Sequence, residues 1–105
     1  MHLAPQGAFN LGYHQQSARI AAFKCDGFRL NEDEVKKLEV LSFNSRLKPH
    51  FDRGRKYAET SFYEIRNENG LKVACGSVLM LYGPFGIQVP NLIEVDEATM
   101  KSLFE

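Results

Sequence analysis

The residues best suited to binding a charged ligand lie between positions 46 and 57. This stretch holds five cations and one acid, interleaved with Phe51 and Tyr57. Arginine and lysine bind phosphates, and exposed aromatic rings stack on unpaired bases, so this stretch is a candidate site for single-stranded nucleic acid or phosphate. The candidate contacts are Arg46, Lys48, Arg53, Arg55 and Lys56. The competing interpretation is a solvated loop between a helix and a sheet with both rings turned inward, and the zero net charge of the chain favours it.

The candidate nucleophiles for catalysis are Cys25 and Cys75, with His2, His14 and His50 as possible bases. Cys75 falls on the apolar face of a predicted strand, where a thiol behaves as a small hydrophobic group. Cys25 falls at the end of a predicted helix, which is the wrong terminus for lowering a thiol pKa. Structural roles are therefore favoured for both cysteines, and no catalytic residue is predicted.

Metal and cofactor motifs are missing from the sequence. The three histidines are scattered, and no Cys-x-x-Cys pair or glycine-rich phosphate loop is present. Glu94, Asp96 and Glu97 cluster, but they supply too few oxygens for a calcium loop. We therefore predict no metal and no cofactor.

An aromatic loop tip, formed by Tyr82, Pro84 and Phe85, lies beside a predicted edge strand over Gly86–Val95. Aromatic side chains give large rigid contact areas, and an edge strand needs protection from unwanted pairing. Pairing with a second copy of the chain would provide that protection. The candidate interface residues are Val40, Phe43, Leu47, Val78, Met80, Tyr82 and Phe85.

The first half of the chain reads as helical. Residues 1–13 are expected to be irregular, and His14–Lys24 to form a helix that Cys25-Asp26-Gly27 ends. A hairpin over Arg19–Leu30 is the alternative. A second helix is expected over residues 31–47, begun by Asn31 as N-cap and stopped by the following proline.

The second helix bears on one class of DNA-binding protein. A helix-turn-helix protein would place the first turn of its second helix in the major groove. Here that turn is Glu32-Asp33-Glu34, which phosphates would repel. This class is therefore disfavoured.

The second half of the chain is richer in β-branched and aromatic residues and in Gly and Pro. A hairpin is expected around the three-residue loop Glu68-Asn69-Gly70, with Leu71–Tyr82 as a central strand buried on both faces. A third strand follows over residues 87–95, where Pro90 marks it as an edge strand. Asp96 can then cap a short helix over Glu97–Phe104.

The expected fold class is α+β. The predicted architecture is an antiparallel three- to four-stranded meander, with two N-terminal helices packed on one face and a short C-terminal helix. With 105 residues the chain suits a single compact domain over residues 1–105. Its 44% hydrophobic content argues against disorder, and its apolar runs are too short to span a membrane. Two cysteines and no signal-peptide pattern at Met1–Phe9 indicate a reduced, cytoplasmic protein.

These observations favour a non-enzymatic interaction module that self-associates, as a homodimer, or that binds another protein. This hypothesis rests on the number of apolar residues, which is larger than one short chain can cover by itself. One alternative is a nucleic-acid or phosphate binder that uses residues 46–57. A second alternative is a protein that holds a small apolar ligand between the sheet and the helices.

Overall fold

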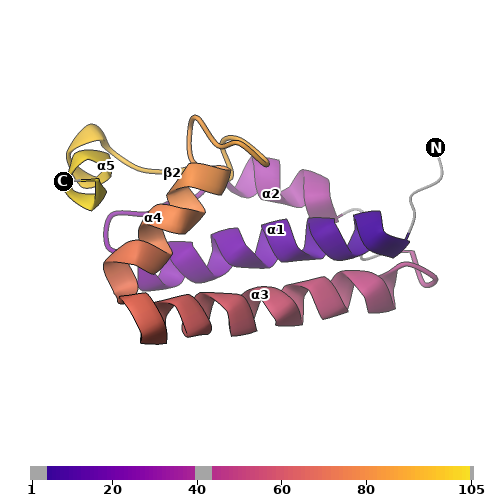
Figure 1. Ribbon diagram of the computed structural model, residues 1–105. Helices are drawn as coiled ribbons and strands as arrows, with labels where there is room; N and C mark the ends of the chain where they lie inside the picture. Colours follow the sequence, from indigo (N-terminus) through magenta and orange to yellow (C-terminus); the bar gives the residue numbers. More distant parts are fainter. Residues whose placement is uncertain (1–4, 40–43, 105) are drawn as a thin grey trace.

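Two long helices, α1 (Pro5–Lys24) and α3 (Lys48–Asn69), lie side by side and run in the same direction (Figure 1). They belong to a computed structural model that describes residues 5–39 and 44–104. Between them the chain passes through β1 (Arg29–Leu30) and α2 (Glu32–Glu39). The chain then continues through α4 (Leu71–Tyr82), β2 (Ile93–Glu94) and α5 (Glu97–Leu103).

Close packing of α1 on α3 depends on one glycine in each helix. A Cβ atom on Gly12 would lie 2.0 Å from the carbonyl oxygen of Phe51, and one on Gly54 would lie 1.9 Å from that of Phe9. These distances are far below van der Waals contact, so each backbone occupies the space where the other helix lacks a side chain. Ala8 and Ala58, both fully buried, lie one helical turn from these glycines and continue the close contact.

The start of α3 is set by Asn44, whose side-chain oxygen accepts hydrogen bonds from the backbone N–H groups of Arg46 and Leu47. Pro49 then occupies the first turn of the helix, where a missing N–H costs nothing. At the other end, Gly70 has φ 94° and its N–H donates to the carbonyl of Arg66. A single residue therefore separates α3 from α4.

Helix α4 folds back over α1 and α3 and supplies much of the core. Its buried positions recur at helical spacing, and Tyr82, its last residue, is fully buried. The core cluster draws its members from each of the first four helices and from the segments around both strands. Its largest fully buried side chains include Tyr82, Leu92, Ile93 and Val35.

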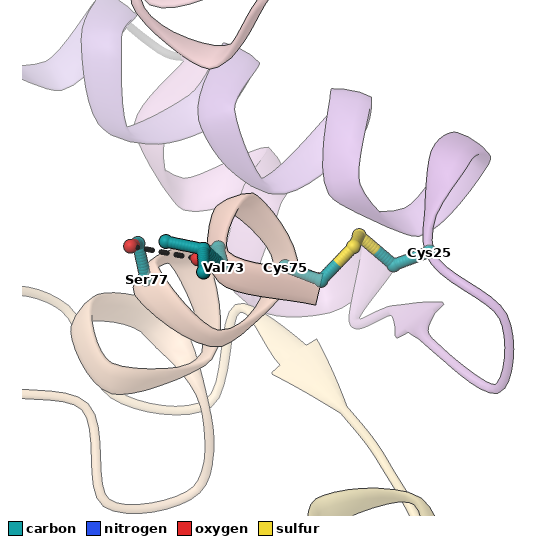
Figure 2. The surroundings of a disulfide bond; sticks show 4 residues. All are labelled: Cys25, Val73, Cys75 and Ser77. Carbon is teal, nitrogen blue, oxygen red and sulfur yellow. Dashed lines mark hydrogen bonds between the residues drawn. A yellow bond between two sulfur atoms is a disulfide. The ribbon is translucent and has the colours of Figure 1, made fainter. Parts of the chain in front are cut away.

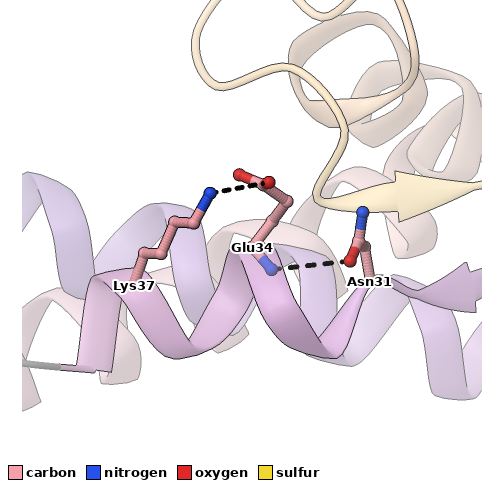
Figure 3. A network of polar contacts seen from close by, with 3 residues as sticks. All are labelled: Asn31, Glu34 and Lys37. Carbon is pink, nitrogen blue, oxygen red and sulfur yellow. Dashed lines mark hydrogen bonds and ion pairs between the residues drawn. The ribbon is translucent and has the colours of Figure 1, made fainter.

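The N-terminus of α2 carries the polar contacts shown in Figure 3. The side-chain oxygen of Asn31 accepts a hydrogen bond from the backbone N–H of Glu34 at 3.4 Å, and the Glu34 carboxylate pairs with Lys37 at 2.9 Å. The prediction that Asn31 caps this helix is confirmed.

The sheet is small: β1 and β2 are antiparallel, with Arg29 opposite Glu94 and Leu30 opposite Ile93. Its role is to hold residues 29–31 against residues 92–94, and Asn31 N–H extends the pairing by donating to the carbonyl of Leu92.

The predicted α+β meander is wrong, because the described residues form five helices and one two-stranded sheet. The expected strands before and after the Glu68-Asn69-Gly70 loop are the end of α3 and the whole of α4. Buried residues of α4 fall at positions 74, 75, 76, 78, 79 and 82, a helical spacing that its apolar composition concealed. Of the third predicted strand, only Ile93–Glu94 pairs.

The predictions for the helices hold in part. The helix over residues 14–24 is confirmed, but it begins at Pro5, so the irregular segment expected before it is wrong over residues 5–13. The hairpin alternative is also wrong. The second helix is confirmed over Glu32–Glu39, and residues 40–43 lie outside the described part. Residues 45–47 form a turn instead, and Pro49 lies in the first turn of α3. The C-terminal helix is confirmed over Glu97–Leu103, and Asp96 accepts a hydrogen bond from Thr99 N–H at 2.7 Å.

Candidate functional site

An exposed apolar groove lies where the end of α4, the following loop and α5 meet. Its volume is about 270 Å³. Phe85 and Ile87, in the loop, are 88% and 74% exposed, while Met80 on α4 and Phe104 after α5 are each 56% exposed. An apolar cluster of this kind on a water-facing surface is typical of a contact site. The groove is lined by Leu79, Met80, Pro84, Phe85, Ile87, Met100 and Phe104.

Backbone hydrogen bonds hold the loop against the last turn of α4. Ile87 N–H donates to the carbonyl of Met80 at 3.1 Å, and Gln88 N–H donates to that of Leu81 at 3.1 Å. Asn91 N–H closes the loop by donating to the carbonyl of Gly83 at 2.9 Å. These bonds use carbonyls that the end of a helix leaves unpaired. The exposed Phe85 is therefore carried on a fixed loop.

The predicted interface residues divide into three groups. Met80 and Phe85 are exposed in the groove. Leu47, Val78 and Tyr82 are buried, with 4%, 7% and 0% of their surface exposed, so they serve the core of this chain. The remaining two residues, Val40 and Phe43, lie outside the described residues.

Sequence reasoning missed four lining residues of the groove: Leu79, Ile87, Met100 and Phe104. The sequence predicts a strand at Ile87, although this residue lies in the loop. Met100 and Phe104 are four residues apart on the predicted C-terminal helix. That spacing is the signal that could have identified an apolar face.

The cations proposed as nucleic-acid contacts lie in and just before the first turns of α3. Arg46 is exposed in the preceding turn. Lys48 forms an ion pair with Asp52 at 2.6 Å, and Arg55 Nε donates to Gln16 Oε1 on α1 at 3.2 Å. These side-chain partners weaken the case for a phosphate site at Lys48 and Arg55.

The other two cations, Arg53 and Lys56, are exposed on α3, and Arg53 hydrogen-bonds His50. The two aromatic residues differ: Phe51 is buried, whereas Tyr57 is 56% exposed. The ring centroid of Tyr57 lies 5.8 Å from that of Phe9. The structure therefore gives the basic stretch one exposed ring and four exposed cations, of which Lys48 is ion-paired with Asp52.

A partly buried polar pair joins α1 to α4. His14 Nδ1 lies 2.7 Å from the hydroxyl oxygen of Tyr82, and their ring centroids are 5.4 Å apart. Burial lowers the pKa of His14 and raises the pKa of Tyr82 well above its usual range. The cavity beside Tyr82 has a volume of about 40 Å³, which is enough for water but too small for an organic ligand.

The two cysteines form a disulfide that links the residue after α1 to α4 (Figure 2). Cys25 and Cys75 have Cα atoms 5.9 Å apart, and both are buried. The disulfide is the structural role of the two cysteines. Because both sulfur atoms are bonded to each other, neither is a thiolate that could attack a substrate. The expectation of reduced thiols is not met.

Within residues 5–39 and 44–104, no group of three or more His, Cys, Asp or Glu side chains is arranged to hold a metal ion. In the same part of the chain, no helix has the length and apolar content needed to cross a membrane.

Comparison with known proteins yields no matching family model, no similar curated protein and no similar solved structure.

Proposed function

We propose that this protein is a non-enzymatic interaction module that self-associates through the apolar groove between α4, residues 83–92 and α5. The observation that supports the proposal is the clustering of exposed Met80, Phe85, Ile87 and Phe104 around one hollow. Covering these side chains with protein would remove a large apolar area from water. The disulfide favours the same conclusion, because it occupies both candidate nucleophiles.

The proposed occupant of the groove is the same surface of a second copy. A two-fold contact brings the same patch of both copies together, so an exposed side chain and a groove on one patch can complement each other. Phe85, which is 88% exposed, lies at the groove that Met80 and Met100 also line. The volume of about 270 Å³ is large enough to receive a single aromatic side chain. In the proposed dimer, Phe85 of each copy enters the groove of the other.

The state of the cysteines bears on the compartment in which the protein works. A cytoplasmic location was predicted on the premise that the thiols are reduced. The Cys25–Cys75 disulfide supports an oxidising compartment instead, because such bonds form and persist there. We therefore propose an oxidising environment for this module.

The test is the molar mass in solution of two matched variants, measured by size-exclusion chromatography with light scattering. Phe85→Asp places a charge in the groove, and Phe23→Asp places one at an equally exposed phenylalanine on α1, outside the groove. We expect the wild type and Phe23→Asp to elute as dimers and Phe85→Asp to elute as a folded monomer. A monomeric wild type, or equal masses for both variants, would contradict the proposal.

Nucleic-acid binding remains the second candidate, supported by the exposed Tyr57 on the same helix as the exposed Arg53 and Lys56. The same chromatography tests it if absorbance is recorded at 260 and 280 nm. The chain has four Tyr and no Trp, so it absorbs weakly at 280 nm and bound nucleic acid would dominate the signal. A salt-sensitive excess at 260 nm would favour this candidate.

A further inference from the structure

A second pocket lies on the flank where the C-terminal half of α1 meets α3. Its volume is about 250 Å³, and it shares no lining residue with the apolar groove. Ile20, which is buried, gives it an apolar wall, and Phe23 on its rim is 83% exposed. The lining residues are Gln16, Arg19, Ile20, Phe23, Lys24 and Tyr63.

Cations and aromatic rings are paired in this pocket. Lys24 Nζ lies 5.2 Å from the ring centroid of Phe23, and the Arg66 guanidinium carbon lies 4.7 Å from that of Tyr63. Arg19 is a further cation in the lining. Such pairs offer a flat apolar face beside a positive charge, so one ligand can stack on a ring and present an anionic group to a cation.

The polar wall of the pocket is held in place by a chain of hydrogen bonds. Gln16 Oε1 accepts from Arg55 Nε at 3.2 Å, and Gln16 Nε2 donates to Glu59 at 3.0 Å. The positive charge of Arg55 therefore balances the negative charge of Glu59, the carboxylate in this series of hydrogen bonds. The lining itself carries two cations, Arg19 and Lys24, and its six residues include no carboxylate.

We propose that this pocket binds a small planar anion, namely a single aromatic ring that carries a phosphate or carboxylate group. The ring would stack against Phe23 or Tyr63, and the anionic group would pair with Arg19 and Lys24. A volume of about 250 Å³ restricts the ligand to one ring. The proposal is independent of self-association, because no residue of the apolar groove takes part.

Titration followed by amide chemical shifts of isotope-labelled protein tests this proposal, with phenyl phosphate and benzoate as probes. Benzyl alcohol supplies the ring without the charge, and inorganic phosphate supplies the charge without the ring. We expect saturable shifts around residues 16–24 and Tyr63 with at least one of the two probes. The comparison of phenyl phosphate with benzoate identifies the preferred anion, and both control compounds should bind about tenfold more weakly or worse.

Three variants complete the experiment. Arg19→Gln combined with Lys24→Gln should weaken binding about tenfold, and Phe23→Leu should weaken it several-fold while the fold persists, because that side chain is exposed. Lys101→Gln is the matched control, since it removes an exposed cation on α5 and should leave binding unchanged. The absence of saturable shifts up to about 10 mM, or equal binding of benzyl alcohol, would overturn the proposal. Equal loss in Lys101→Gln would overturn it too, since it would indicate nonspecific charge attraction.

Discussion

The hydrogen bond between His14 and Tyr82 is the polar contact that ties the middle of α1 to the last residue of α4. Tyr82 is fully buried and His14 is half-buried, so a charge on the imidazole would be poorly solvated. Tyr13 and Ser17 are the other polar side chains that influence Tyr82. The pair therefore stabilises the fold with His14 in its neutral form.

This arrangement predicts a pH-dependent stability. Burial lowers the folded-state pKa of His14 below its ordinary value of 6.5. As the pH falls through 6.5, the unfolded chain takes up a proton that the folded chain takes up only at a lower pH. The free energy of unfolding should thus be highest above 6.5 and decrease as the pH falls toward the folded-state pKa. Urea denaturation at several pH values above the carboxylate range measures this decrease.

The variant His14→Gln is the control for that measurement. It removes the titrating group and keeps a polar side chain of similar reach toward Tyr82. Its unfolding free energy should vary less with pH over the same interval. An identical pH dependence in the variant and the wild type would assign the effect to another group.

At the scale of elements, the parallel contact of α1 with α3 depends on the missing side chains of Gly12 and Gly54. Gly12→Ala should lower the free energy of unfolding by about 3 kcal/mol, because its Cβ would overlap the Phe51 carbonyl and force the helices apart. Gly76→Ala is the matched control: this buried glycine lies in α4, and an added Cβ would meet only Phe104 at 3.7 Å. It should be neutral or stabilising by up to about 1 kcal/mol. Equal losses in both variants, measured by urea denaturation, would contradict the close-packing argument.

Local signals in the sequence predicted the ends of elements better than their type. Asn31 and Asp96 were correctly identified as N-caps because a capping side chain acts on residues two or three positions away. Pro49 was misassigned, since a proline that stops one helix can equally begin the next. The Asn69-Gly70 pair suits a hairpin turn, and it suits a helix end just as well.

The type of the second-half elements depended on packing that the sequence does not display. Residues 71–82 are apolar on more than one side, and such a run does not separate a buried strand from a buried helix by period alone. Tertiary burial against α1 and α3 decides in favour of the helix. The same ambiguity limited the prediction of the interface residues. A loop tip and a nearby apolar run were enough to predict that Phe85 and Met80 are exposed. The burial of Val78 and Tyr82 depends on the neighbouring helices, which the sequence does not display.

At the scale of the whole molecule, the disulfide links the end of α1 covalently to α4. Cys25 and Cys75 are 50 residues apart in the sequence, and the closed loop contains β1, α2 and α3. Closing a loop of this size lowers the conformational entropy of the unfolded chain. The bond therefore stabilises the helical assembly as a unit.

Removing that bond gives a prediction for the entire fold. The double variant Cys25→Ser, Cys75→Ser should lose about 4 kcal/mol of unfolding free energy, the amount that chain entropy predicts for a loop of this length. The measurement is urea denaturation followed by far-ultraviolet circular dichroism. Wild-type protein denatured with a reducing agent should match the variant, which separates loss of the bond from any effect of the serines. If the variant and the oxidised wild type were equally stable, packing of α4 on α1 and α3 would suffice without the disulfide.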